Sequence, residues 1–204
     1  MSMPMLSLRV MFSCVALNRM VCGHGCLFCE CRAGAQALQV FESHAGELDE
    51  STFLEYCVPM LKDIASGVRR ECSAAGIECP PLIVFARNAH TNTSMEQIAL
   101  CGYDAISVDW AASGAQVRTC VDAACAAAGV RPPTLQGNFD PIKLFGSPEF
   151  IRAEVKRMME SFGVDRYVAN LGHGMMPSHD PEHLRVFVDA VHEHSALTCQ
   201  QKIG

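Results

Sequence analysis

Residues 82–110, LIVFARNAHTNTSMEQIALCGYDAISVDW, contain one complete structural unit and indicate the fold of the whole chain. Two short runs rich in Val, Ile and Ala, at 82–87 and 105–110, flank a loop and a helix-like segment that Gly102 is placed to end. Continuous apolar runs of this length are typical of strands buried in a parallel sheet. The unit is therefore predicted to be strand, helix, strand.

The same unit recurs from residue 33 onward. The runs ALQVFES (37–43), TLQGNF (134–139) and YVANLG (167–172) also lead into a loop and a helix-like segment, which makes five strand–helix units in all. Their spacing allows right-handed crossovers, so a parallel α/β protein is predicted. Two architectures fit: an open doubly wound sheet, or a partial (β/α)8 barrel with about five of the eight units of a whole one.

Helix ends can also be located. Ser147, Pro148 and Glu149 provide an N-cap, a proline in the first turn and an acid at the positive end of a helix that Gly163 closes. Residues 180–182 (DPE) repeat this pattern. Pro59 interrupts the apolar periodicity of residues 50–75, so a short helix followed by a longer one starting at the proline is expected there.

Composition limits the classes of partner. The chain has 204 residues, half of them apolar, and a formal net charge of -6, which fits one domain with a substantial core and does not indicate a nucleic-acid binder. An acidic chain attracts an anionic ligand only through a few local cationic or N–H groups. No membrane partner is expected, because no run after residue 30 reaches the roughly 18 apolar residues of a membrane span. The apolar start is interrupted by Arg9, Asn18 and Arg19, although a targeting role for it stays open.

Cysteines raise a separate question. Seven of the twelve are scattered singly through helix-like and strand-like runs, where a thiol acts as a small apolar group, and a reducing compartment is the simpler interpretation. The stretch CGHGCLFCEC, in contrast, spaces Cys22, Cys26 and Cys29 as C-x3-C-x2-C, the pattern with which radical-SAM enzymes hold an iron–sulfur cluster. His179 and His183 form a second, weaker metal-ligand pattern at i and i+4.

Polar residues follow every predicted strand. The carboxyl ends of parallel strands meet on one face, where α/β proteins bind their ligands, so a single binding face is predicted there. The residues concerned are Glu42, Ser43 and His44, then Arg87 to His90, then Asp109 and Trp110, then Gly137 to Asp140, and finally Asn170 to Gly174.

The sharpest of these groups is NLGHG at 170–174. Glycines on both sides of His173 allow the backbone to turn tightly and bring the imidazole close to a ligand, where it can donate to a carboxylate or transfer a proton. A purely structural loop, with the imidazole bonded to backbone, is the alternative.

Five segments in order carry a family resemblance. AGAQALQVFESHAGELDE, LIVFARNAH, GYDAISVDW, TLQGNFDPIKLFGS and RYVANLGHGMMPSHDPEHLRVFVDAVHEHS together resemble the C-terminal half to two-thirds of the uroporphyrinogen decarboxylase family. The resemblance implies a family-like partial barrel over 33–197, an irregular extension unrelated to the family over 1–32, and a short tail over 198–204. It also favours incidental cysteines over a cluster site.

The resemblance implies a chemistry. Members of this family are cytoplasmic homodimers folded as distorted (β/α)8 barrels. They decarboxylate the acetate side chains of uroporphyrinogen to give coproporphyrinogen, in haem biosynthesis, without a metal or an organic cofactor. Protonation of a pyrrole carbon makes the ring an electron sink for the departing carboxylate, so the expected partners are these two porphyrinogens and a second subunit.

Three positions match substrate-contacting residues of the family. Ser43 in FESHAG resembles a hydroxyl that binds a substrate carboxylate, His173 in NLGHG resembles a carboxylate-binding histidine, and Phe41 resembles part of the apolar floor of the cleft. Asp109 in SVDW is expected to be structural, held in a buried hydrogen-bond network. Around residues 87–89 the family usually carries glycine, so the shape of that loop is uncertain.

The family's catalytic groups have no counterpart in the sequence. Its arginine-rich segment, its aspartate for the pyrrole N–H groups and a nearby tyrosine are absent, so no catalytic residue is assigned. Three hypotheses follow: a working decarboxylase, an inactive truncated remnant of one, or, more remotely, a metal or iron–sulfur protein that uses Cys22, Cys26 and Cys29.

Overall fold

The predicted strands are neighbours in one parallel sheet. The computed structural model describes residues 10–14, 23–89 and 91–203, with side chains for residues 25–89 and 91–196. Within these residues six strands pair in the order β1-β2-β3-β4-β5-β6. They are β1 (Val10–Cys14), β2 (Ala37–Glu42), β3 (Leu82–Ala86), β4 (Ala105–Ser107), β5 (Thr134–Phe139) and β6 (Tyr167–Leu171).

The strand order decides between the two architectures. Each strand pairs with the next along the chain, as in a barrel, whereas the order of a doubly wound sheet reverses at a switch point. Among the described residues the sheet does not close, since β1 and β6 are its two edges. The fold is therefore a partial (β/α)8 barrel, and the five predicted strands correspond to β2 through β6.

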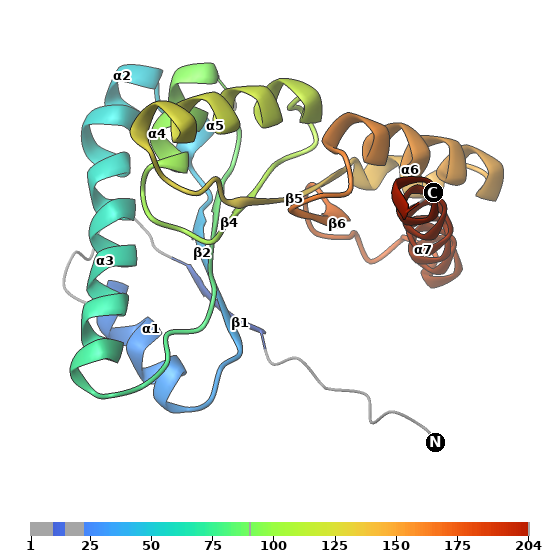
Figure 1. Cartoon of the computed structure of the whole chain (residues 1–204). Coiled ribbons are helices and arrows are strands. Elements are labelled where there is room, and N and C mark those ends of the chain that lie inside the picture. Colours follow the sequence, from blue (N-terminus) through green and yellow to red (C-terminus); the bar gives the residue numbers. More distant parts are fainter. Residues whose placement is uncertain (1–9, 15–22, 90, 204) are drawn as a thin grey trace.

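The helices follow one another around the outside of the sheet (Figure 1). In the described chain α1 packs on α3, and each helix from α3 to α7 packs on the next one. None of the described helices combines the length and the apolar character needed to cross a bilayer. The helices are α1 (Gly23–Arg32), α2 (Glu50–Thr52), α3 (Val58–Ala74), α4 (Asn92–Ala99), α5 (Gly114–Ala128), α6 (Pro148–Phe162) and α7 (Pro181–Ile203), with 3-10 turns at Ala45–Glu47 and Pro141–Phe145.

One expectation about the ends of the chain needs correction. The described part of 1–32 is not irregular, because it contains β1 and α1. Leu27 and Cys31, one helical turn apart, are both buried and form an apolar side of α1, which packs on α3. At the other end, α7 continues through the predicted tail to Ile203.

The predicted helix ends are confirmed. The hydroxyl of Ser147 accepts the N–H of Phe150 at 3.3 Å, and Gly163 ends α6 with a φ of 71°. A short α2 precedes a longer α3 that begins at Val58 and has Pro59 in its first turn, close to the expected start, but a π-helical segment, Phe53–Cys57, joins the two without a break. Proline lacks the N–H of a regular α-helix, and a wider turn accommodates its absence.

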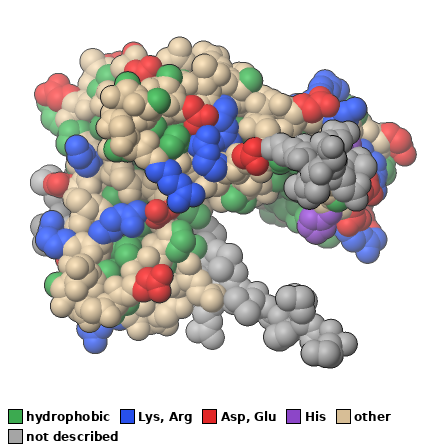
Figure 2. Space-filling model, in the orientation of Figure 1, with side chains coloured by type: hydrophobic (Ala, Val, Ile, Leu, Met, Phe, Trp, Pro, Cys, Tyr) green, Lys and Arg blue, Asp and Glu red, His purple; other side chains and the backbone are tan. Residues whose placement is uncertain are grey.

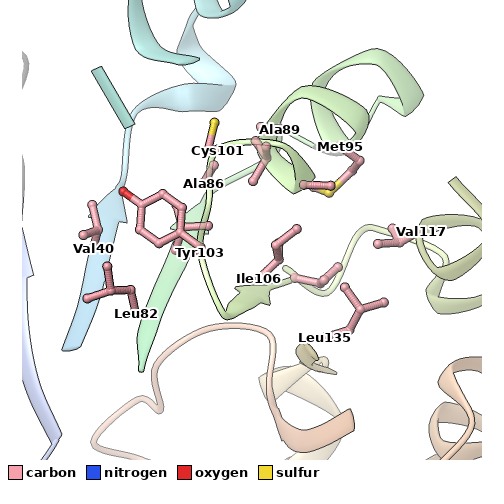
Figure 3. Close-up of a cluster of buried hydrophobic side chains, with 14 of the residues drawn as sticks. Val40, Leu82, Ala86, Ala89, Met95, Cys101, Tyr103, Ile106, Val117 and Leu135 are labelled. Atoms are coloured by element: carbon pink, nitrogen blue, oxygen red, sulfur yellow. The ribbon is translucent and has the colours of Figure 1, made fainter. Parts of the chain in front are cut away.

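The core lies between the sheet and the helices. Side chains that alternate along β2 to β5 face the helices, and Figure 3 shows Val40, Leu82, Ile106 and Leu135 in this cluster with Met95 of α4. Full burial of such side chains contributes about 1.5–3 kcal/mol each. This layer fixes the register of the strands, and the register fixes what the other face presents.

The opposite face of the sheet carries a different set of side chains. Phe41, Phe85, Ser107, Gln136 and Val168 occupy one level across five strands, according to the strand register. None of them belongs to the helix-facing core, and Ser107 and Gln136 are buried polar residues joined by a 3.3 Å hydrogen bond. The inner face of the barrel is therefore partly polar, as a binding face requires.

Candidate functional site

A cavity of about 410 Å³ lies on this inner face, at the carboxyl ends of the strands. It brings together Phe41, Ser43 and His173, the three residues predicted from the sequence as substrate contacts. The cavity is large enough for part of a macrocyclic ligand, and its lining combines aromatic rings with a few polar groups, the usual character of a ligand site. The remaining lining residues are Gln39, Phe85, Arg87, Ser107, Asn170, Leu171, Gly172, Gly174 and Met175.

The β2 side of the cavity has an aromatic residue within the strand, Phe41, and a polar one just after the strand ends, Ser43. The rings of Phe41 and Phe85 meet edge to face with centroids 5.9 Å apart, which gives the cavity a flat apolar wall. Ser43 follows β2 by one residue and is half-buried, and its hydroxyl has no partner in the described part of the chain. This hydroxyl is available to a ligand.

The histidine of the NLGHG loop lines the cavity and has one of its nitrogens bonded to the backbone. Its Nδ1 accepts the N–H of Gly174 at 2.7 Å, so in the neutral ring the proton resides on Nε2. The Trp110 ring holds the imidazole edge to face, with centroids 5.5 Å apart. His173 can therefore donate from Nε2 to a carboxylate oxygen without first being protonated.

Only one of the two flanking glycines is required by the packing. A Cβ on Gly172 would lie 2.4 Å from the backbone nitrogen of Trp110, whereas a Cβ on Gly174 would meet no heavy atom within 4 Å. Neither has a positive φ. The tight-turn explanation is therefore replaced by a close approach of the loop after β6 to the backbone after β4.

Asp109 is structural, as expected. It is buried, and its carboxylate accepts the backbone N–H of Asn88 and, at 2.8 Å, that of Ala111. Asn88 has a φ of 59°, a conformation that glycine adopts readily and that Asn tolerates better than most residues. The loop that lacks the family's glycine thus keeps a left-handed turn, and Asp109 fixes it.

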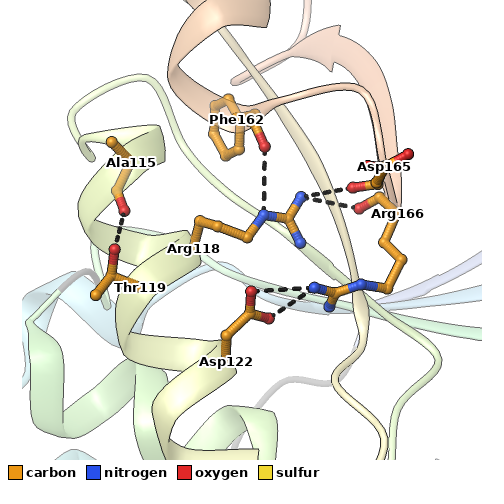
Figure 4. Close-up of polar contacts among 7 residues, drawn as sticks. All are labelled: Ala115, Arg118, Thr119, Asp122, Phe162, Asp165 and Arg166. Atoms are coloured by element: carbon orange, nitrogen blue, oxygen red, sulfur yellow. Dashed lines mark hydrogen bonds and ion pairs between the residues drawn. The ribbon is translucent and has the colours of Figure 1, made fainter. Parts of the chain in front are cut away.

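The start of β6 is anchored from α5 (Figure 4). The Arg118 guanidinium donates to the carbonyls of Phe162, Asp165 and Arg166 at 3.0–3.3 Å. The Arg166 side chain in turn binds both carboxylate oxygens of Asp122 at 2.9 and 3.0 Å. Burial lowers the pKa of Arg118, and the positive charge of the neighbouring Arg166 lowers it further. These contacts position the strand that leads to His173.

The described residues contain no set of ligands that would support the metal or iron–sulfur hypothesis. No group of three or more His, Cys, Asp or Glu side chains there is arranged to hold an ion. Cys22 lies outside the described residues, while Cys26 and Cys29 occupy exposed positions of α1. His179 and His183 use their Nδ1 atoms within the fold, the first with the N–H of Met176 and the second with the carbonyl of Leu144.

The scattered cysteines behave as apolar groups. Cys57, Cys72, Cys101 and Cys125 are buried thiols in the core, and burial raises the pKa of Cys57 and of Cys101 to about 11. Such thiols remain protonated near neutral pH and are poor nucleophiles and poor metal ligands.

The geometry can be compared with known proteins. A family model described as uroporphyrinogen decarboxylase (URO-D) matches residues 27–194, most of the chain. The chain belongs to this family. The match to the uroporphyrinogen decarboxylase family thus begins at Leu27, inside α1, and not at residue 33 as expected from the sequence.

Relatives in the uroporphyrinogen decarboxylase family are clear but longer. The uroporphyrinogen decarboxylases of Pongo abelii and Homo sapiens are each 44% identical to this chain over 82% of its length and 43% of theirs. The one from Salinibacter ruber is 45% identical over 80% of this chain and 42% of its own. The chain therefore spans less than half the length of the curated relatives it matches.

Solved structures resemble the family fold seen here. A dihydropteroate synthase from Anaplasma phagocytophilum, with bound 6-hydroxymethylpterin-monophosphate, has a TM-score of 0.53 and 17% identity, covering 95% of this chain and 76% of that one. A putative lyase/mutase from Burkholderia cenocepacia has a TM-score of 0.50 and 16% identity, covering 90% and 66%. At these identities the likeness concerns the fold alone.

Several lining residues were not identified as site residues from the sequence. Gln39, Phe85 and Ser107 lie inside predicted strands, where only the choice of inward face distinguishes them from core residues. The two-residue period of a strand could have identified them, because residues two positions apart share a face. Gln39 precedes Phe41 by two positions, and Arg87 follows Phe85 by two. Once Phe41 is assigned to the cavity, the same face of the neighbouring strands follows.

Proposed function

We propose that the chain binds uroporphyrinogen in the cavity at the strand ends and removes carbon dioxide from its acetate side chains, giving coproporphyrinogen. The observation that carries this proposal is the convergence of Phe41, Ser43 and His173, from β2 and from the loop after β6, on one cavity of about 410 Å³. Membership in the uroporphyrinogen decarboxylase family provides the chemistry.

In this proposal each lining group has one task. The Phe41 and Phe85 rings contact pyrrole faces, and the Ser43 hydroxyl and the Nε2–H of His173 donate to side-chain carboxylates. Protonation of a pyrrole carbon then draws the electrons of the departing carboxylate into the ring. Exclusion of water by the aromatic wall strengthens these hydrogen bonds.

A second candidate is binding of the porphyrinogen without turnover. One observation favours it: none of the described residues that line the cavity is Asp or Glu. The described lining would then lack a carboxylate to hold the pyrrole N–H groups. Binding and turnover therefore need separate measurements.

The test measures both on the purified chain. We expect loss of carboxylates from uroporphyrinogen, followed by chromatography of the products after oxidation, and binding of the oxidised porphyrin followed by fluorescence. His173→Ala should lower binding and turnover by about ten-fold or more, the effect of a hydrogen bond to a charged group. His192→Ala, at an exposed position of α7 that does not line the cavity, is the matched control.

The outcomes separate the candidates. Binding and turnover that both depend on His173 support the decarboxylase. Binding that depends on His173, without turnover, supports the second candidate. Absence of binding contradicts both, and an equal loss in the two histidine variants contradicts the assignment of His173.

Two further parts of the proposal rest on the family alone. We propose that the chain acts in the cytoplasm and assembles as a homodimer, as its relatives are expected to do. Sedimentation equilibrium of the purified chain tests the assembly, and a mass of one protomer at micromolar concentration would contradict it.

A further inference from the structure

Arg87 has the position of a ligand-binding group. It directly follows β3, two residues after Phe85, so its side chain lies on the inner face and lines the cavity together with Ser43 and His173. Its backbone N–H donates to the carbonyl of Glu42 at 3.1 Å, and the next N–H, that of Asn88, donates to the carboxylate of Asp109. The backbone around Arg87 is thus held on both sides.

The Arg87 side chain, in contrast, lacks a partner among the described residues. Its Nε is buried and has no hydrogen-bond partner, and no described acid forms an ion pair with the guanidinium. The other half-buried arginines differ. Although Arg118 and Arg166 each leave one buried nitrogen unpaired, Arg118 donates to three carbonyls through two other nitrogens, and Nη2 of Arg166 binds the Asp122 carboxylate. A buried N–H group with no acceptor is unfavourable unless water or a ligand accepts its hydrogen bond.

The cavity favours an anion at this point. Arg87 is the only Lys or Arg among its described lining residues, and none of those residues is acidic. On the face shown in Figure 2, Lys and Arg side chains are interspersed with Asp and Glu, and the whole chain has a formal net charge of -6. Attraction of an anion must therefore come from this local guanidinium and not from the overall field.

The geometry selects the class of anion. A guanidinium offers two parallel N–H groups that match the two oxygens of a carboxylate, and the neighbouring Phe41 and Phe85 rings offer an apolar wall. We propose that Arg87 binds one carboxylate of a ligand whose aromatic ring carries carboxylate side chains. This proposal rests on the proposed function, in which that ligand is uroporphyrinogen, and it adds a cationic anchor to Ser43 and His173.

The test uses two ligands and three variants of the full chain. Uroporphyrin, the fluorescent oxidised form, is titrated by fluorescence, and phenylacetate, one ring with one carboxylate, is titrated by NMR. Arg87→Gln should weaken uroporphyrin binding about ten-fold to a hundred-fold, the usual effect of losing a charge-assisted hydrogen bond. Arg87→Lys should lose less, because it keeps the charge without the paired donors. Arg131→Gln, at an exposed position outside the cavity, is the matched control.

Salt dependence gives an independent readout. Binding by the wild-type chain should weaken with added sodium chloride, and the slope should be shallower in Arg87→Gln but unchanged in Arg131→Gln. A merely structural role for Arg87 would not produce this pattern. Circular dichroism and urea unfolding establish that each variant is folded before it is titrated.

The results distinguish the two proposals. Arg87-dependent binding of both ligands supports both. Arg87-dependent binding of phenylacetate alone supports the anchor and contradicts the porphyrinogen as ligand. Equal affinity of Arg87→Gln and wild type for uroporphyrin overturns the anchor while leaving the proposed function intact. Absence of binding to either ligand overturns both.

Discussion

Asn88 shows how one residue preserves a loop when the expected glycine is missing. Its φ of 59° is in the left-handed region, and its N–H is bonded to the buried Asp109. Asn reaches this region at less cost than β-branched residues, whose Cβ crowds the following carbonyl. The residue before it, Arg87, depends on this turn for its position on the cavity wall.

We therefore predict opposite results for two substitutions of Asn88. Asn88→Val should lower the free energy of unfolding by about 1–2 kcal/mol, the cost of the left-handed conformation. Asn88→Gly should change it by less than about 1 kcal/mol, because glycine adopts this conformation freely. Urea unfolding followed by the fluorescence of the single tryptophan, Trp110, measures both. Equal stability of the two variants would contradict the argument.

Glu42 gives a prediction about pH. Burial raises the pKa of this carboxyl above its ordinary 4.5, although the N–H of His44, which it accepts at 3.1 Å, acts in the opposite direction. The folded state therefore binds the proton more tightly than the unfolded state does. The contribution of Glu42 to stability is complete below pH 4.5 and is lost as the pH rises through the raised pKa.

Glu42→Gln removes this titration, because an amide is neutral at every pH and still accepts the His44 N–H. The free energy of unfolding of the variant minus that of wild type should therefore be larger at pH 7 than near pH 4.5. Urea unfolding at both pH values measures the difference. Glu160→Gln, at an exposed position of α6, is the control, and a pH-independent difference for Glu42→Gln would refute the assignment.

At the scale of elements, the loop after β6 depends on one close contact. Gly172 lies against the backbone of Trp110, and a Cβ there would be 2.4 Å from the backbone nitrogen and 2.9 Å from the Cα of Trp110. These are backbone atoms, which cannot move aside as the end of a flexible side chain would. This contact therefore fixes the position of the loop that carries His173.

Gly172→Ala should lower the free energy of unfolding by about 1–3 kcal/mol, as overpacking does, and should weaken porphyrin binding by displacing His173. Gly174→Ala is a matched control on the other side of the same histidine, because its Cβ would meet nothing within 4 Å. It should change stability by less than about 0.5 kcal/mol. Thermal unfolding and fluorescence titration of both variants decide the matter, and similar losses in the two would be evidence against the close contact.

The elements also show what the sequence can and cannot reveal. Strands β2 to β6 were predicted because their apolar runs are short and bounded by turn residues, and Phe41, Ser43 and His173 converge because parallel strands end on one face. The helix α1 was not predicted, because no resemblance to the family was found over residues 1–32 and an irregular extension was expected there. Leu27 is buried and α1 packs on α3, and this packing appears only in the tertiary structure.

The role proposed for Arg87 could not be predicted from the sequence, for a related reason. Its position after a strand was readable, but the absence of a partner for its Nε depends on which side chains lie across the inner face. Sequence periodicity gives the face of a residue and not its neighbours. Which side chains of other strands neighbour Arg87 can therefore be seen only in the folded chain.

At the scale of the whole molecule, the dominant feature is that the sheet does not close among the described residues. In the described part of the chain β6 pairs with β5 on one side only, and Val168 in the middle of β6 is 47% exposed. An uncovered strand edge with an exposed β-branched side chain is a template for pairing with another chain. A closed barrel has no such edge.

We predict that the purified chain self-associates through β6 and that Val168→Lys reduces this association. A lysine on an edge strand opposes edge-to-edge pairing, because pairing would bring like charges together and desolvate them. Val130→Lys is a closely matched control, since Val130 is also 47% exposed but lies after α5, away from any strand edge. Sedimentation velocity over a hundred-fold concentration range should show a lower average mass for Val168→Lys only. An equal decrease in both variants would indicate a general effect of charge, and no decrease in either would locate the contact away from β6.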